Sequence, residues 1–153
     1  MGFLFLLFSL NSFAGNAYPK FPDLTVTPGS LCDSPTSYRY AEHIPYCERE
    51  LNSFGKELIF INYRKLGYSL SGERHQYKID HFIPLCMGGS NNDNNLWPQY
   101  YTISARTDLL ETRGCEVLAM GKISQREVIA LIIKAKMDWK EAPAVLKYLN
   151  RLR

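Results

Sequence analysis

The sequence carries almost no excess charge of either sign. Its 153 residues include 18 Lys and Arg against 15 Asp and Glu, which leaves a formal net charge of +3. A protein that binds nucleic acid through bulk charge shows a clustered basic excess, so composition alone does not argue for that function. Any contact with phosphate must therefore come from a local arrangement of side chains.

Long apolar runs, internal repeats and low-complexity tracts are also missing, apart from one Asn-rich loop at 91–95. The apolar run at 3–10 is shorter than the roughly 20 residues that cross a bilayer. Hydrophobic residues make up 46% of the chain and charged residues 22%, proportions that exclude bulk disorder. A chain of this length fits one domain, and its 13% of aromatic residues can supply a core.

The N-terminal residues have the pattern of a secretory leader. Residues 3–10 are almost entirely apolar, and Ala14 and Ala17 both stand at the end of a small-x-small cleavage site. The pattern predicts a signal peptide at 1–17 and a mature chain at 18–153. A charged segment before the apolar run is missing, and the alternative interpretation is a buried N-terminal strand or helix. Export would place the four cysteines in an oxidising compartment, where disulfides form.

The mature chain has the pattern of an α+β domain. After a Pro-rich lead-in, periodicity and capping residues predict helices at 53–66, 103–120, 125–139 and 143–151. Alternation predicts a strand at 76–84, and a Gly- and Asn-rich loop separates it from a short second strand at 96–97. The apolar stripe of the first helix is expected to contain Phe54, Leu58, Ile61 and Lys65.

A carboxylate and an imidazole stand side by side at Asp80 and His81. Such a pair can hold a divalent metal ion through the carboxylate while the imidazole moves a proton. On a regular strand the two side chains point to opposite faces, so they converge only where the strand is distorted or ends. Pro84 is compatible with such an end. Taken alone the dipeptide is a weak signal, because a surface pair or a structural histidine gives the same letters.

Three motifs together resemble one family. They are D-H-F-I-P at 80–84, G-G-S at 88–90 and N-L-W-P-Q at 95–99. In this combination they resemble the HNH nucleases, the ββα-metal or His-Me finger endonucleases. The helix segment A-R-T-D-L-L-E at 105–111 and the Cys-bracketed lead-in at 28–47 look like those of the secreted bacterial subgroup.

The resemblance implies a fold and a set of roles. The fold is a ββα-metal (HNH) finger with flanking helices, in a small disulfide-stapled single domain whose motif core spans about 78–111. His81 matches the general base that takes a proton from the attacking water. Asp80 matches a ligand of a single divalent metal ion, and Asn95 matches the residue that pins the loop and holds the His-bearing strand.

One departure leaves the second metal ligand open. Many HNH proteins place a His or Asn on the helix where this chain has Ser104, a poor ligand. Asp108 and Glu111, three residues apart on one helix stripe, are the candidates, and both can instead be solvated charges of the first helical turns. Arg106 is the first candidate for a contact with substrate phosphate. The expected cofactor is one divalent ion, Mg²⁺ in the first place, with Mn²⁺ or another divalent ion as alternatives.

The family resemblance also sets an expectation for the four cysteines, for which three pairings are possible. We expect Cys32 with Cys47, closing a local loop, and Cys86 with Cys115, tying the site loop to the site helix.

Two functions remain open from the sequence. The first is a secreted or periplasmic, metal-dependent endonuclease that hydrolyses phosphodiester bonds, with DNA favoured over RNA as substrate. The second is a non-catalytic, disulfide-stapled secreted binding module on an HNH-like scaffold. We expect a monomer with no membrane segment after signal cleavage.

Overall fold

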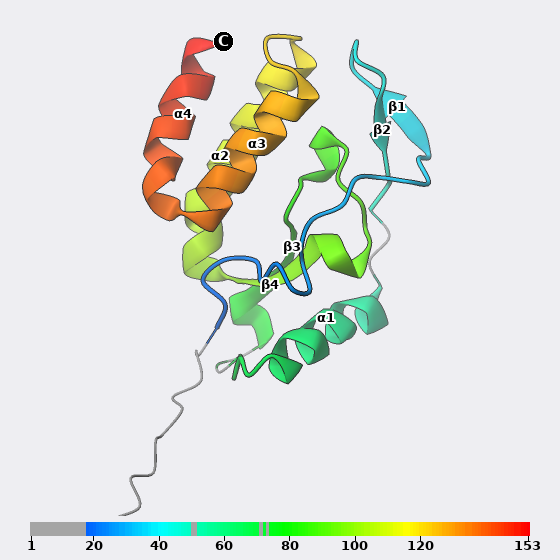
Figure 1. Cartoon of the computed structure of the whole chain (residues 1–153), viewed down its shortest axis with the longest axis vertical. Coiled ribbons are helices and arrows are strands. Elements are labelled where there is room, and N and C mark those ends of the chain that lie inside the picture. Colours follow the sequence, from blue (N-terminus) through cyan, green and yellow to red (C-terminus); the bar gives the residue numbers. More distant parts are fainter. Residues whose placement is uncertain (1–17, 50–51, 71, 73) are drawn as a thin grey trace, which may run out of the picture.

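A two-stranded antiparallel sheet lies between one helix and a layer of three helices (Figure 1). The structure, a computed structural model, describes residues 18–49, 52–70, 72 and 74–153. Its helices and strands are β1 (Ser37–Arg39), β2 (Ile44–Tyr46), α1 (Ser53–Lys65), β3 (Tyr77–His81), β4 (Leu96–Tyr100), α2 (Tyr101–Ala119), α3 (Gln125–Met137) and α4 (Ala142–Arg151). The expectation of a small α+β domain is confirmed. The predicted signal peptide at 1–17 lies outside the described residues.

The central sheet consists of β3 and β4, and α2 follows β4 directly. The register pairs Tyr77 with Tyr100 at one end and His81 with Leu96 at the other. β3 ends at His81, earlier than predicted, whereas β4 is longer than predicted and continues through Pro98. A proline is tolerated there because a sheet of two strands leaves one side of each strand without a ladder partner.

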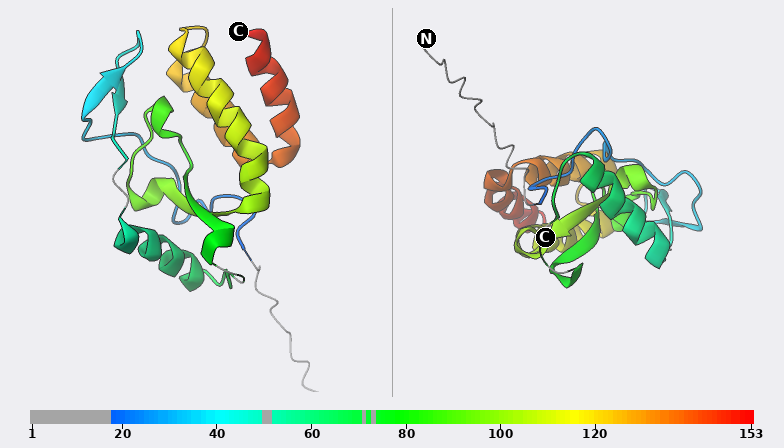
Figure 2. Two further views of the ribbon diagram at one scale, coloured as in Figure 1. Left: turned by 180° about the vertical axis from the view of Figure 1, so that it is seen from behind. Right: turned by 90° about the horizontal axis from the view of Figure 1, so that it is seen from below.

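Capping residues set the starts of two helices as predicted. The Asn52 side chain accepts a hydrogen bond from the Gly55 N–H at the start of α1, and Ser124 with Glu127 forms a capping box on α3. The segment between Cys32 and Cys47 contains the short hairpin of β1 and β2, which lies on the opposite side of the molecule from α4 (Figure 2).

The predicted apolar stripe of α1 is wrong. Ile61 is 38% exposed and Lys65 is exposed, whereas Ile59, Phe60 and Tyr63 are buried. These three side chains pack against the aromatic residues of β3 and β4, which therefore decide the buried face. The Phe54 side chain lies outside the described part of the structure.

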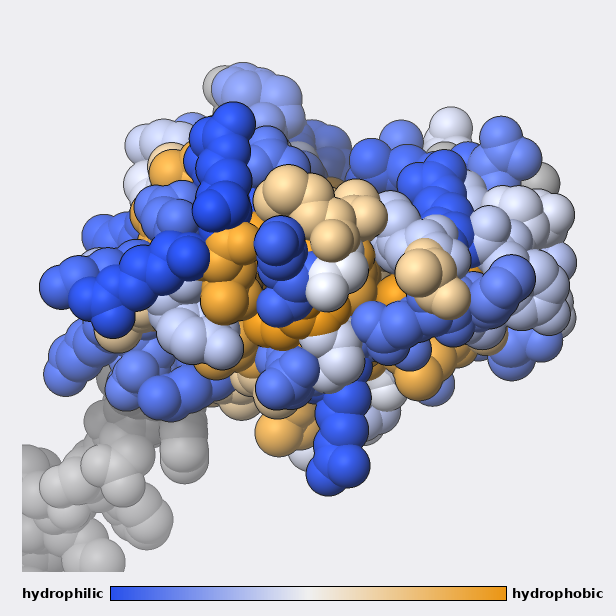
Figure 3. Space-filling model, turned by 90° about the horizontal axis from the view of Figure 1, so that it is seen from above, coloured by the Kyte–Doolittle hydropathy of each residue, from blue (hydrophilic) through white to orange (hydrophobic). Residues whose placement is uncertain are grey.

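The buried side chains form two clusters on the two sides of the sheet region. One joins α1 to β3, β4 and the start of α2, and includes Trp97, which is fully buried in the core. The other fills the space between α2, α3 and α4 and extends to Met87 and Ile44. Seen from above, apolar residues also reach the surface near the middle of the molecule, within a rim of hydrophilic side chains (Figure 3).

Both expected disulfides are present. Cys32 pairs with Cys47 and Cys86 with Cys115, at Cα–Cα distances of 5.6 and 5.9 Å. Two disulfides are consistent with a protein that resides in an oxidising, extracellular compartment.

Within the residues described, no helix combines the length and the apolar character that a membrane span requires.

Candidate active site

The residues that the sequence singles out meet where β3 ends. Asp80 and His81 are the last two residues of this strand, and each is only 6% exposed. The chain leaves the sheet directly after His81, where the Phe82 N–H donates to the carbonyl oxygen of Asn95 at 2.7 Å. The strand therefore ends three residues before Pro84, the end that its pattern predicted.

Asn95 fixes the loop that connects the two strands. Its amide nitrogen donates to the carbonyl oxygens of Ile83 and Ser90, at 3.0 and 2.9 Å. Its amide oxygen accepts from the N–H of Ile83 at 2.9 Å, and the side chain is fully buried. Gly89 is needed for this closure, since a Cβ there would lie 1.8 Å from the carbonyl oxygen of Ile83. Asn95 thus holds the segment that follows His81, as the family resemblance implies.

The imidazole of His81 is oriented by Asn91. Asn91 Nδ2 donates to the carbonyl oxygen of Glu48 at 2.6 Å, so its Oδ1 is the atom that lies 3.0 Å from His81 Nε2. Because an amide oxygen only accepts, the hydrogen of a neutral His81 sits on Nε2 and leaves Nδ1 free to accept a proton. Burial lowers the pKa of His81 below its ordinary value, against the opposing effects of Asn91 and Asp80.

A buried lysine lies between Asp80 and the site helix. Lys136, on α3, is 1% exposed, and its ammonium nitrogen lies 2.9 Å from Asp80 Oδ2 and 2.7 Å from Glu111 Oε1. The same ammonium group donates to the carbonyl oxygen of His81. Lys136 therefore joins the end of β3 to α2 through one charged group.

The charged groups of this cluster shift one another's pKa values. Burial alone would raise the pKa of Asp80, but Lys136 and Lys78 hold it below its ordinary value. Burial lowers the pKa of Lys136, and the two carboxylates outweigh that effect and raise it. Burial raises the pKa of Glu111 to about 7, with Asp80 adding to the increase. Asp80 is thus the ionised partner of Lys136 at neutral pH, and Glu111 is the weaker acid.

Asp108 lies further out than Glu111. Its side chain is 56% exposed and is paired with the ammonium group of Lys78, which also lies 3.3 Å from Asp80 Oδ1. Ser104 donates to the carbonyl oxygen of Tyr101 in its own helix. The structure therefore brings Glu111 to Asp80 through Lys136, and Asp108 to Asp80 through Lys78.

This arrangement does not fit a bound divalent ion as it stands. Lys136 already places a positive charge between Asp80 and Glu111, and a metal ion in the same space would meet it at short range. In the part of the chain that the structure describes, no group of three or more His, Cys, Asp or Glu side chains is arranged to hold a metal ion. The metal-ligand roles of Asp80, Asp108 and Glu111 remain predictions.

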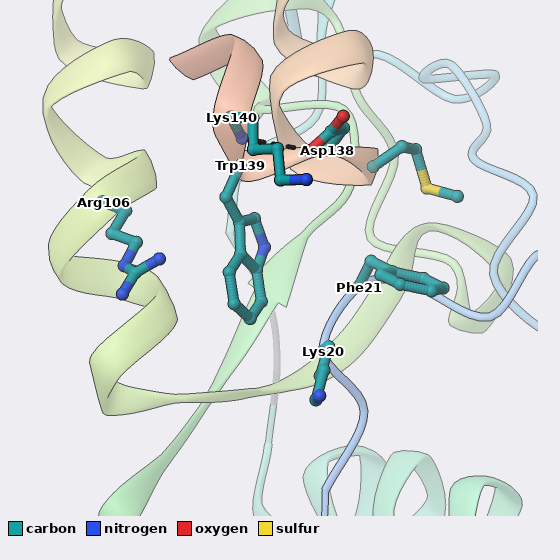
Figure 4. A pocket seen from close by; sticks show the side chains of 7 residues that line it. Lys20, Phe21, Arg106, Asp138, Trp139 and Lys140 are labelled. Atoms are coloured by element: carbon teal, nitrogen blue, oxygen red, sulfur yellow. Dashed lines mark hydrogen bonds between the residues drawn. The ribbon is translucent and has the colours of Figure 1, made fainter. Parts of the chain in front are cut away.

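Arg106 lines a cavity whose lining does not include Asp80, Glu111 or Lys136. Its guanidinium carbon is 5.0 Å from the centre of the Trp139 ring, and Figure 4 shows the two side chains with Lys20, Phe21 and Lys140. This cavity, of about 400 Å³, is formed by the start of α2, the segment after α3 and the N-terminal lead-in. Arg106 thus contacts Trp139 and lines this cavity, and its contact with substrate phosphate remains a prediction.

A basic cavity adjoins the outer part of the cluster. It has a volume of about 420 Å³ and is lined by Arg49, Lys56, Arg74, Tyr77, Lys78 and Ile79. Lys78 belongs to both the cavity and the cluster, since it also contacts Asp80 and Asp108. The cavity lining has four cationic side chains and no carboxylate, which favours an anionic ligand.

Two residues of the site were missed from the sequence. Lys136 follows Val128 and Ile132 at intervals of four residues on the buried face of α3, so a lysine on an apolar stripe was the available signal. Asn91 gave no distinguishing signal, because it is one of several asparagines in a loop of turn-forming residues.

Comparisons of the chain with protein-family models, with curated proteins and with solved structures found no match.

Proposed function

We propose that the protein is an endonuclease that hydrolyses phosphodiester bonds, with His81 as the general base. The observation that carries the proposal is the oriented imidazole at the end of β3, beside a carboxylate and a basic cavity. This arrangement agrees with the roles that the resemblance to HNH nucleases assigns to His81, Asp80 and Asn95.

The chemical step assigned to His81 is the removal of a proton from water. Nδ1 of the neutral imidazole takes the proton as the water oxygen bonds to phosphorus. The bond from phosphorus to the leaving sugar oxygen breaks, and that oxygen takes a proton from a solvent water. The hydrogen bond from His81 to Asn91 prevents the ring from turning and keeps Nδ1 as the acceptor. Asn95 supports this geometry by fixing the backbone that follows the ring.

We assign the stabilisation of negative charge on the phosphate to the cationic side chains around the site. Lys78 stands at the border between the basic cavity and Asp80, with its side chain 38% exposed. Arg49, Lys56 and Arg74 line the same cavity, where they would hold the phosphates that flank the cut. We assign no step to a divalent ion, because Lys136 occupies the space between Asp80 and Glu111.

The proposed substrate is DNA in preference to RNA, and the proposed location is the periplasm or the medium. The two disulfides and the leader-like residues 1–17 support the location. The sequence of the N-terminus of protein recovered from these compartments tests it, with Gly15 or Tyr18 expected as first residue. An intact Met1 would contradict export.

Digestion of supercoiled plasmid and of a structured RNA by the purified protein tests the activity, in parallel samples with Mg²⁺, with Mn²⁺ and with EDTA. Nicked and then linear plasmid supports the proposal. Plasmid that is bound but not cut in all three samples contradicts it and favours the non-catalytic binding module.

A further inference from the structure

The Lys136 ammonium group makes its contacts inside the protein, with hydrogen bonds to Asp80 and the main chain of His81 and an ion pair with Glu111. A lysine ammonium has three N–H donors. The structure gives this one three oxygen neighbours, on Asp80, Glu111 and the main chain of His81. These neighbours come from the end of β3 and from α2, while Lys136 itself belongs to α3. The ammonium group thus links the end of β3 to α2, as a metal ion bound by both elements would.

We propose that Lys136 takes the place of the divalent cation in this site. A fixed ammonium group neutralises Asp80 and Glu111 and holds the His81 main chain, so the protein needs no divalent ion to assemble its site. Lys136 is a positioning residue, because its ammonium group is enclosed by these three oxygens and the residue is only 1% exposed. The inference rests on the proposed function only where it concerns cleavage, since the position of the ammonium group is independent of any substrate.

Lys78 completes this arrangement at the surface. It contacts Asp80 on the oxygen that Lys136 does not use, and it lines the basic cavity. Asp80 therefore has a lysine on each of its two carboxylate oxygens. A carboxylate that is paired on both oxygens is a poor metal ligand until one lysine leaves, and the buried one has no open route to solvent in this structure.

The substitution Lys136→Met tests the proposal by removing the charge and keeping the length of the side chain. It leaves Asp80 and Glu111 facing each other without a cation, which is an arrangement that binds divalent ions. Titration calorimetry with Mn²⁺ measures the affinity of the full-length wild type and of the variant. We expect at least tenfold tighter binding by the variant, and a rise in its melting temperature on addition of Mn²⁺.

Two further variants keep the test decisive. Lys134→Met, two residues away on α3 and exposed, removes a lysine of the same helix and should leave Mn²⁺ affinity unchanged. Lys136→Met combined with Glu111→Gln should lose the gain in affinity, and it removes one of the unpaired charges if the single variant folds poorly.

Mn²⁺ binding by the wild type as tight as, or tighter than, that of Lys136→Met would overturn the proposal. So would wild-type cleavage that occurs with Mg²⁺ and stops in EDTA, because the proposal expects comparable rates in the two conditions. If the protein cuts nothing, the proposed function fails, while the Mn²⁺ titration still decides the role of Lys136.

Discussion

The side chain of Asn91 decides which nitrogen of His81 can accept a proton. Asn91 Oδ1 lies 3.0 Å from His81 Nε2, and its Nδ2 is committed to the carbonyl oxygen of Glu48 at 2.6 Å. The loop between β3 and β4 therefore fixes both the orientation and the tautomer of the ring.

The rate of cleavage should fall on the acid side of neutrality. The base must be neutral, and burial lowers the pKa of His81 below 6.5, with Arg49 and Lys136 acting in the same direction and Asp80 and Asn91 opposing them. The rate attributable to His81 should therefore stay constant from pH 8 to about pH 6.5 and decrease only below that value. A profile of kcat against pH measures this.

The lowered pKa of His81 also affects the stability of the folded protein. Because the folded state binds a proton on His81 less readily than the unfolded state, the contribution of His81 to stability should decrease as the pH falls below about 6.5, whereas Glu111, with its pKa raised to about 7, acts in the opposite direction over the same range. Unfolding midpoints in urea at several pH values, compared between the wild type and His81→Ala, isolate the contribution of His81. A rate that decreases already above pH 7, with stability unchanged, would contradict the assignment of His81 as the titrating base.

Replacement of Asn95 by alanine should destabilise the protein by about 2 to 4 kcal/mol, because two carbonyl oxygens and one N–H in the loop lose their partner. Urea denaturation measures the change. Asn92→Ala is the matched control, since Asn92 is exposed in the same loop and its replacement should change stability by less than about 0.5 kcal/mol. Equal effects of the two substitutions would show that Asn95 does not anchor the loop.

Removal of charge from the basic cavity should weaken binding to DNA. The double variant Arg49→Gln and Lys56→Gln keeps the ion pairs of Asp80 with Lys78 and Lys136 and should lower the slope of affinity against salt concentration by about 1 for each lost phosphate contact. Fluorescence anisotropy with a labelled duplex at several salt concentrations measures it. Lys122→Gln with Lys147→Gln, two exposed lysines outside this cavity, is the control with the same change in net charge. Identical slopes for both double variants would remove the cavity as the binding site.

Replacement of both Cys86 and Cys115 by alanine should cost roughly 3 to 4 kcal/mol of stability, because the bond closes a long loop in the unfolded chain. The bond joins the turn before the Gly88–Gly89 pair to α2. Guanidinium denaturation of the double variant measures the loss, with the Cys32–Cys47 pair replaced in a second variant for comparison. A loss of less than about 1 kcal/mol would show that the bond is absent or adds no constraint.

Much of this fold could be predicted because its signals are local. The capping box at Ser124, the alternation before Pro84 and the glycines of the loop each act over a few residues. The buried face of α1 could not be predicted in the same way, because the aromatic residues of β3 and β4 select Ile59, Phe60 and Tyr63.

The residues of the candidate site likewise divide into those that local sequence signals predict and those that depend on long-range contacts. The positions of Asp80, His81 and Asn95 follow from motifs that lie close together in the sequence, whereas Lys136 reaches Asp80 from a helix 56 residues further along the chain. Sequence periodicity does not predict a long-range pair of this kind. The only signal for it was the lysine on the apolar stripe of α3. Asp108 and Glu111 could not be ranked from helix geometry, because their different surroundings are set by Lys78 and Lys136.

Plasmid nicking by the wild type and by His81→Ala tests the central claim most directly. The account predicts that the wild type nicks supercoiled DNA and that His81→Ala, folded and still able to bind DNA, is slower by about 10² to 10⁴. His43→Asn, at a position whose φ of 52° asparagine accepts, should cut at the wild-type rate. A folded His81→Ala protein that nicks as fast as the wild type, or a wild type that leaves the plasmid intact with Mg²⁺, with Mn²⁺ and in EDTA, would contradict it.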